Sequence, residues 1–193
     1  MKSTRHIDGT LLLVLLLAIL ILPAPLWAQV GEAVSPPRDT LIAAARQIME
    51  AARFCALITI DKSGHPRVRT MDPFPPEDDM VIWLGTNRRT RKVEDIRKNR
   101  RVTLFYLDPH GSGYASIDGT ARLVDDAEEK ALRWKTEWEQ FYPDRETSYL
   151  LIEVTPLRLE VVNYTRGVVG KPKTWLPPSV EFNVKKVKHS HEH

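Results

Sequence analysis

Apolar and polar residues follow two different periods along the chain, and these periods predict its secondary structure. From Thr40 to Arg53 apolar residues recur every three or four positions, which predicts a helix with one apolar face. Asp39 or Thr40 would cap it. A short, largely solvated helix is predicted over 91–99. A longer one is predicted to run from a cap at Asp125 or Asp126 to about Tyr142, with an inner face formed by Ala131, Trp134 or Lys135, and Trp138.

Between these helices, short runs of apolar and β-branched residues predict about seven strands. The segment 61–66, Asp-Lys-Ser-Gly-His-Pro, predicts the turn of a hairpin, and the proline-rich segment 71–79 predicts a loop. A turn is also expected at Gly85-Thr86-Asn87, and Pro156 would break a strand. The predicted strands cover 54–60, 67–71, 80–84, 102–107, 114–124, 149–154 and 157–164, with a further short one at 180–184. Because most links are short, the pattern favours a mainly β (α+β) fold, an antiparallel sheet closed toward a barrel with flanking helices.

The first residues form a different kind of segment. Lys2 and Arg5 precede twelve apolar residues, 11–22, and Ala28 follows a short proline-containing stretch. This order is typical of a signal peptide over 1–28, and it predicts an exported protein, periplasmic or secreted. The alternative is an uncleaved membrane anchor. Twelve helical residues span only about 18 Å, however, short of the roughly 30 Å of a bilayer core, so no stable membrane association is expected after cleavage.

Composition bounds the remaining chain. After removal of residues 1–28, the 193-residue chain would consist of a flexible lead-in over 29–38, one domain over 39–184 and a disordered tail over 185–193. The tail carries three alternating histidines. The 28 basic residues exceed the 25 acidic ones by only three, which argues against a dedicated nucleic-acid binder. The single cysteine, Cys55, cannot form an internal disulfide and is expected to be a small buried side chain.

One stretch concentrates positive charge. Eight basic residues lie within 88–101, against only Glu94 and Asp95. The stretch includes the start of the predicted helix, where unpaired N–H groups favour anions. Thr90, Arg91 and Lys92 could together surround a phosphate. The alternatives are a solvated helical face or a nucleic-acid contact, and the latter is disfavoured by the lack of interleaved aromatic residues.

The segment 84–104, LGTNRRTRKVEDIRKNRRVTL, resembles the flavin-phosphate segment of the pyridoxamine 5′-phosphate oxidase-like family. Arg67-Val68-Arg69-Thr70 is similar to the family's preceding flavin-binding strand, and 118–124 is similar to its Gly-x-Ala strand. The resemblance spans about residues 40–183. Lys171–Trp175 further resembles a segment of the general stress protein-like branch.

The resemblance implies a fold, a cofactor and a partner. The fold would be an FMN-binding split barrel of six to seven strands, and the chain would form a homodimer with FMN in a groove between the subunits. Thr90, Arg91 and Lys92 would bind the FMN phosphate, Thr86 would lie beside the cofactor, and Arg67, Val68, Arg69 and Thr70 would run along its ring system. Trp175 would either close over the ring or, as we prefer, pin the tail to the barrel.

The sequence also departs from the family in ways that bear on activity. Enzymes that oxidise pyridoxamine phosphate carry a lysine after the flavin-binding strand and an Arg-x-His element near their end, whereas this chain has Asp72 and no such element. Vitamin B6 oxidation is therefore not expected. We expect an FMN-dependent oxidoreductase acting on an unknown small molecule, with no obligatory catalytic side chain because the flavin does the chemistry, and no metal site. The alternatives are a non-catalytic flavin-binding or stress protein, and a haem- or deazaflavin-binding relative.

Overall fold

A computed structural model describes residues 35–142 and 144–183 of the chain. Seven named strands dominate this part, and helices and 3-10 turns join them. The strands are β1 (Cys55–Ile60), β2 (Pro66–Met71), β3 (Ile82–Asn87), β4 (Arg101–Leu107), β5 (Gly113–Val124), β6 (Tyr149–Asn163) and β7 (Ser179–Glu181). The helices are α2 (Arg38–Ala52), α3 (Arg91–Lys98), α4 (Ala127–Leu132) and α5 (Arg145–Ser148), with 3-10 turns η2 (Thr136–Phe141) and η3 (Tyr164–Arg166).

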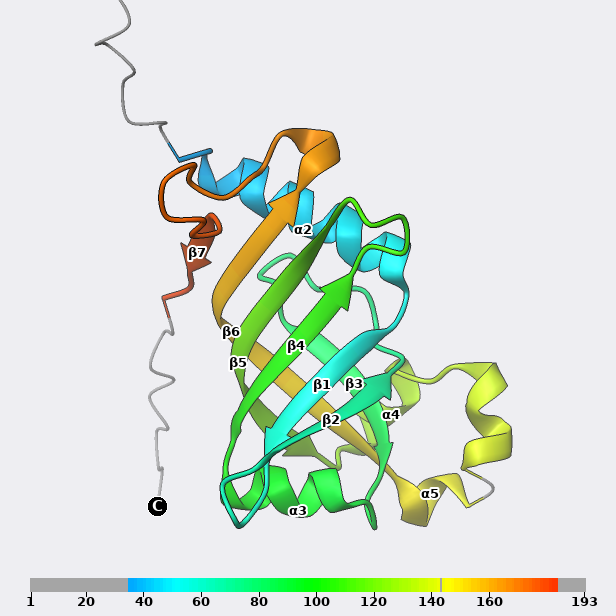
Figure 1. The fold of residues 1–193 in the computed structure, drawn as a ribbon. Coiled ribbons are helices and arrows are strands. Elements are labelled where there is room, and N and C mark those ends of the chain that lie inside the picture. Colours follow the sequence, from blue (N-terminus) through cyan, green and yellow to red (C-terminus); the bar gives the residue numbers. More distant parts are fainter. Residues whose placement is uncertain (1–34, 143, 184–193) are drawn as a thin grey trace, which may run out of the picture. The chain divides into compact units, whose positions relative to one another are not determined.

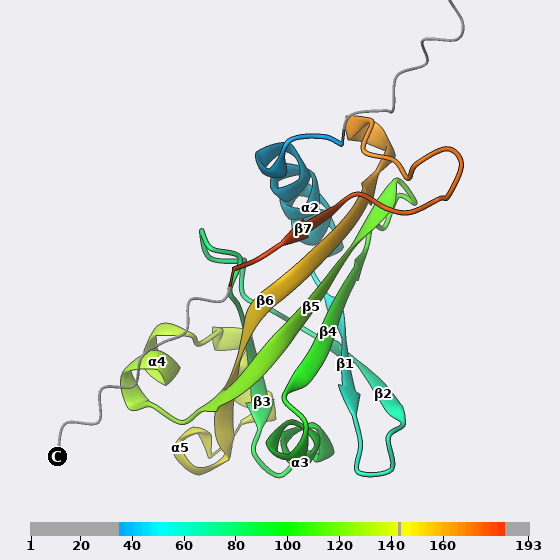
Figure 2. The same ribbon diagram turned by 90° about the vertical axis from the view of Figure 1, so that its left-hand side faces the viewer.

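The strands form one antiparallel sheet in the order β2-β1-β4-β5-β6-β3, and β7 adds to β6. The sheet curls until its two ends approach each other (Figures 1 and 2), and a single bridge between Pro73 and Leu84 joins the continuation of β2 to β3. The result is an open, mainly β barrel with helices outside it. The predicted fold class, a split barrel with flanking helices, is confirmed.

The barrel interior is apolar, and helices cover its two ends. α2 crosses one end and inserts the stripe predicted from its spacing, Leu41, Ala44, Ala45, Ile48 and Met49. α3 lies across the opposite end (Figure 1), where Val93 and Ile96 are buried. Burial of apolar surface contributes about 25 cal/mol for each Å² removed from water, so these apolar faces are the main source of stability. Cys55 is buried in this core, as expected.

Two predictions about helices are wrong. Neither Asp39 nor Thr40 caps α2, because the helix begins at Arg38 and Pro37 precedes it without a side-chain hydrogen bond. The long helix predicted to Tyr142 is divided into α4 and η2, and Ala131 is exposed. Asp126 does cap α4, accepting hydrogen bonds from the N–H groups of residues 128 and 129. The break brings Lys135 and Trp138 to Asp72, and these contacts replace the continuous helix.

Two predictions about strands also need correction. Gly85-Thr86-Asn87 is not a turn but the end of β3, paired with residues 149–151 of β6. Pro156 does not break the last strand, because β6 continues through it and shifts register opposite Asp118 and Gly119. Proline lacks a donor, so the sheet accepts it where the ladder is already irregular.

Three of the predicted segments lie wholly or mostly outside the described residues. The signal peptide over 1–28 and the tail over 185–193 lie outside them, as does most of the lead-in over 29–38. Within the described part, no helix is long and apolar enough to cross a bilayer.

Candidate functional site

The site begins with the alternation of side chains along β2. Antiparallel partners share one face of a sheet, and Arg67 and Arg69 pair with Thr59 and Leu57, which are fully buried. Both arginines therefore project toward the inner side of the curled sheet, at the end that α3 covers. Because β2 is the first strand in the sheet order, it pairs with β1 on one edge only, and its other edge is open to a ligand.

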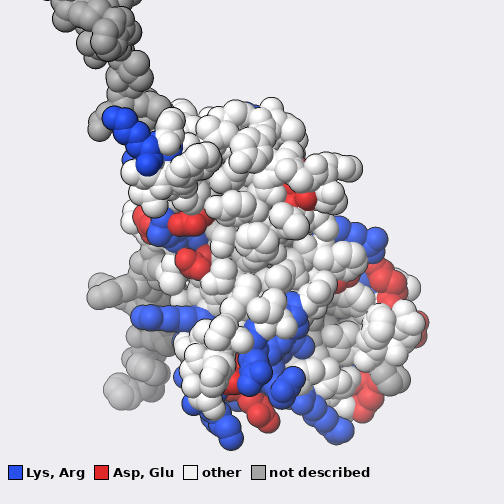
Figure 3. All heavy atoms as spheres, in the orientation of Figure 1, with Lys and Arg blue, Asp and Glu red and all other residues white. Residues whose placement is uncertain are grey.

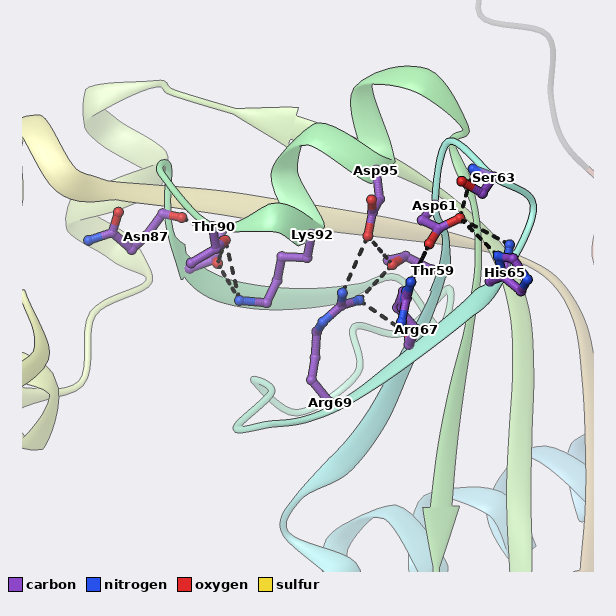
Figure 4. Close-up of polar contacts among 11 residues, drawn as sticks. Thr59, Asp61, Ser63, His65, Arg67, Arg69, Asn87, Thr90, Lys92 and Asp95 are labelled. Atoms are coloured by element: carbon purple, nitrogen blue, oxygen red, sulfur yellow. Dashed lines mark hydrogen bonds and ion pairs between the residues drawn. The ribbon is translucent and has the colours of Figure 1, made fainter.

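Arg69 is held by contacts from two other elements (Figure 4). Its guanidinium donates to Thr59 Oγ1 at 2.6 Å and to the Asp95 carboxylate at 3.3 Å, and Thr59 donates to the same carboxylate at 2.8 Å. Thr59 and Asp95 are buried in β1 and α3. A guanidinium has five donors in one plane, so these contacts fix its orientation and leave other donors free.

Arg67 is held by the hairpin turn beside it. Its guanidinium donates to Asp61 at 2.8 Å. Hydrogen bonds from the backbone N–H groups of His65 and Ser63 and from Arg67 together lower the pKa of Asp61 to about 2. The turn thus keeps a permanent negative charge that holds Arg67 near Arg69.

A pocket of about 370 Å³ lies between this hairpin and α3. Five of its lining residues are basic and three are acidic, and two of the acids, Asp61 and Asp95, already bind arginines of the same pocket. The lining residues are Asp61, Lys62, Ser63, Arg67, Arg69, Arg91, Glu94, Asp95 and Lys98. In Figure 3 basic side chains gather at the same end of the molecule, over β2 and α3. The pocket therefore has an excess of cationic donors.

Lys92 lies beside this pocket and lacks an acidic partner among the described residues. Its ammonium donates only to hydroxyl oxygens, Thr86 Oγ1 at 3.1 Å and Thr90 Oγ1 at 3.4 Å. The pKa of Lys92 is lowered by burial and, to a lesser extent, by the nearby charge of Arg69. A half-buried ammonium next to a second cation is costly for an empty site, and an anion would relieve the cost.

The start of α3 adds backbone donors to the same place. Thr90 precedes the helix, but its hydroxyl donates to the Asn87 carbonyl at 2.8 Å and caps no helical N–H. The first N–H groups of a helix have no intrahelical acceptor, and they carry the positive end of the helix dipole. Backbone and side chains here both favour an anion.

The predicted site residues thus divide into three sets. Arg67, Arg69 and Arg91 line the pocket, and Thr86, Thr90 and Lys92 form a hydrogen-bonded group next to it. Val68 and Thr70 lie on the opposite, outer face of β2 and are exposed.

Sequence reasoning did not assign a role to Thr59, Asp61 or Asp95. Asp61 was placed only in a turn, and Asp95 only as a minority acid in the basic stretch. A signal for Asp95 existed in its position: it comes four residues after Arg91, on the same side of α3, and near Val93 and Ile96, which turn inward. Thr59 gave no signal beyond its place at an inner strand position.

The other end of β2 has different chemistry. Asp72 follows β2, and its carboxylate accepts from Lys135 Nζ at 2.7 Å and Trp138 Nε1 at 3.0 Å. Lys135 also lies over the rings of Phe74 and Trp138, 5.1 and 5.0 Å from their centroids. The carboxylate is therefore already neutralised.

Two smaller expectations concern residues elsewhere. Trp175 is 81% exposed, so it does not pin the tail to the barrel by packing against it. In the described residues, no three His, Cys, Asp or Glu side chains are close enough together to hold a metal ion.

The fold and the site define a split-barrel protein with a pocket rich in basic side chains at the open edge of its sheet. The sequence profile of the pyridoxamine 5′-phosphate oxidase family matches residues 41–163, and the chain belongs to that family. No match was found among curated proteins.

Solved structures with the same fold include two related to general stress protein 26. One, from Clostridium acetobutylicum, has a TM-score of 0.62 at 20% identity and covers 76% of this chain and 97% of its own. General Stress Protein 26 from Bacillus anthracis has a TM-score of 0.54 at 22% identity, covering 62% and 92%. A heme binding protein from Mycobacterium smegmatis has a TM-score of 0.52 at 16% identity, covering 67% and 55%. At these identities the likeness concerns the fold.

Proposed function

We propose that this protein binds FMN and acts as an FMN-dependent oxidoreductase on a small molecule. The phosphate would lie among Arg67, Arg69, Arg91 and Lys92, with Thr86 and Thr90 as hydroxyl partners, and the ring system would extend along β2. The observation that carries this proposal is Lys92, a half-buried ammonium with only hydroxyl partners beside an arginine-lined pocket. A phosphate dianion supplies the missing charge and several acceptors.

The bound flavin would supply hydride transfer, and the chain's own residues would hold and orient it. Asp61 and Asp95 fix the two β2 arginines, so little side-chain freedom would be lost when phosphate binds. Oxidation of a phosphorylated B6 vitamer is not part of this proposal, because a substrate phosphate at the end of β2 would meet the Asp72 carboxylate.

We further propose that the active form is a homodimer. The outer face of β2, β1, β4 and β5 carries apolar side chains that no described helix covers. Val68 and Leu107 are 65% and 62% exposed, and Phe105 stacks on Tyr114 with centroids 5.6 Å apart. A second copy seated on this face would cover them and reach Val68 and Thr70, which explains why these two predicted cofactor residues point away from the pocket. Export to the periplasm or beyond remains part of the proposal, supported by the order of residues 1–28.

The absorption spectrum of protein isolated from its native compartment tests the cofactor. We expect bands of oxidised flavin, with FMN released on denaturation. Ligand-free protein should bind FMN more tightly than riboflavin, which has the same ring and no phosphate. A Soret band, a deazaflavin spectrum, or equal affinity for FMN and riboflavin would contradict the proposal. Photoreduced protein that is reoxidised at one rate by every acceptor would favour the non-catalytic alternative.

A further inference from the structure

A second pocket, of about 590 Å³, lies where β2 ends, away from α3. It opens between α2, the loop after β2, the C-terminal end of β4 and the start of η2. Its lining residues are Arg46, Met49, Glu50, Arg53, Asp72, Pro73, Phe74, Pro75, Pro76, Tyr106, Lys135 and Glu137. The volume is within the range of small-molecule sites. Because β2 is the strand proposed to carry the flavin ring, this pocket lies at the far end of the cofactor from its phosphate.

The charges around this pocket cancel, in contrast to those around the phosphate pocket. Three lining residues are basic and three are acidic. Arg46 donates to the carbonyls of Pro76 and Glu77, and Lys135 pairs with Asp72. The other three, Glu50, Arg53 and Glu137, are exposed. The formal charges of the lining sum to zero, so no net charge would offset the hydration that a charged ligand loses, and the pocket favours a neutral one.

The walls of the pocket suit a flat apolar ring. Four consecutive lining residues, Phe74 and three prolines, come from the loop, and Met49 lines the pocket from α2. Prolines are already restricted, so packing against a ligand costs them little conformational entropy. Methionine adapts to an aromatic partner through its polarisable sulfur.

One polar group in the wall has only a weak partner. Tyr106 is 1% exposed, and its hydroxyl lies beside the Cys55 thiol, with no nitrogen or oxygen partner among the described residues. Burial raises the pKa of Tyr106, and burial also raises the pKa of its neighbour Cys55 to about 12, so both groups remain neutral. Buried hydroxyls almost always hydrogen-bond to nitrogen or oxygen, and one with only a weak thiol partner calls for an explanation. A ligand oxygen that accepts from this hydroxyl provides one.

We propose that the pocket binds a neutral aromatic carbonyl compound, with its ring between Phe74, Met49 and the prolines and its oxygen accepting from Tyr106. The assignment of this compound class as the substrate of the flavin site rests on the proposed function. The binding itself requires no cofactor, so it can be measured separately.

Three naphthalenes of similar size serve as probes in calorimetric titrations of FMN-free protein. 2-Acetonaphthone is neutral and has a carbonyl, 2-ethylnaphthalene lacks the oxygen, and 2-naphthoate is an anion. We expect 2-acetonaphthone to bind about tenfold more tightly than either of the others, as one well-formed hydrogen bond allows. Tightest binding of the anion, or no measurable binding of any probe, would overturn the proposal. FMN titrated into the same preparation reports on the cofactor site alone.

Two substitutions locate the binding. Tyr106→Phe removes only the hydroxyl, and it should lower the affinity for 2-acetonaphthone to that for 2-ethylnaphthalene. Glu50→Trp fills the pocket from an exposed position of α2 and should abolish binding of all three probes. Ala51→Trp, at the next exposed position and outside this pocket, is the matched control and should leave binding unchanged. Unchanged binding in Glu50→Trp would refute the site even if Tyr106→Phe failed to fold.

Discussion

Two regions of the molecule hold cations in opposite ways. Next to η2, Arg133 and Lys135 each pair with a carboxylate and lie over an aromatic ring. Arg133 bonds to Glu77 and Glu129 and lies 3.8 Å from the centroid of Trp83, and Lys135 bonds to Asp72. At the phosphate pocket, Lys92 has only hydroxyl partners.

The difference separates structural from binding cations. Lys92 and Lys135 are both half-buried lysines, so burial alone does not distinguish them. Lys135 completes a contact between distant segments, whereas Lys92 leaves a charge that a ligand can use. Substitution of the first should affect folding, and substitution of the second should affect binding.

The largest effect is expected for the tryptophan at the centre of the paired region. Trp138 is buried, and its indole contacts Phe74 edge-on at 5.5 Å and donates to Asp72. Trp138→Ala should lower the free energy of unfolding by about 3–5 kcal/mol, measured by denaturant titration. Trp175→Ala is the control, because its exposed ring should contribute less than about 0.5 kcal/mol. Equal effects of the two would argue against a stabilising role for the contacts of Trp138.

Lys92→Met should weaken FMN binding by about 1.5–3 kcal/mol, roughly ten- to a hundredfold, because a charged donor to phosphate is lost. Stability should not fall, since burial already disfavours the ammonium in the fold. Fluorescence titration with FMN and riboflavin measures the first effect, and riboflavin affinity should stay the same. An equal loss for both flavins would place Lys92 away from the phosphate.

Lys135→Met is the matched control for Lys92→Met, and it should give the reverse pattern. Asp72 would keep Trp138 as a partner but lose its cation, which should cost about 1–3 kcal/mol of folding free energy. FMN affinity should be unchanged. If Lys135→Met instead weakened FMN binding as strongly as Lys92→Met, the distinction between the two regions would fail.

Asp95→Asn should have a smaller effect, and one of opposite sign on binding. The variant removes a negative charge from the pocket while Thr59 still holds Arg69 at 2.6 Å. FMN affinity should therefore rise roughly three- to tenfold, because less repulsion faces the phosphate. Saturating FMN should also raise the melting temperature more than it does in the unsubstituted protein. Weaker FMN binding would show that Asp95 is needed mainly to orient Arg69.

The smallest expected effect is a dependence of FMN affinity on pH. The pKa of Lys92 is lowered in the ligand-free site, and a bound phosphate would raise it. FMN affinity is then complete below the ligand-free pKa and is lost as pH rises from that value toward the pKa in the complex. Dissociation constants measured across alkaline pH should show this loss. Its persistence in Lys92→Met would assign the titration to another group.

The sequence was informative wherever a local pattern decided the structure. The spacing in 40–53, the turn at 61–66 and the strand over 67–71 all depend on neighbours along the chain, and the structure confirms them. Belonging to the family was also predictable, because the order of residues 84–104 is distinctive.

What could not be predicted depends on contacts between distant segments. The separation of α4 from η2 follows from Lys135 and Trp138 reaching Asp72, more than sixty residues earlier. Pro156 stays within a strand because the bulge at Asp118/Gly119 faces it. The role of Asp95 requires knowing that β1, β2 and α3 meet. The first two contacts leave no local pattern, and the local position of Asp95 on α3 does not reveal its partners.

The continuous β6 has a consequence for how the chain folds. This strand pairs with β5, β3 and β7, so β3 finds its partner only about sixty residues later in the sequence. Sheets built on such distant pairings form slowly, because a long loop must close before any contact compensates for its entropy. During synthesis, β3 cannot join the sheet until residues 149–154 have emerged from the ribosome, and until then its apolar side chains are accessible to chaperones and proteases.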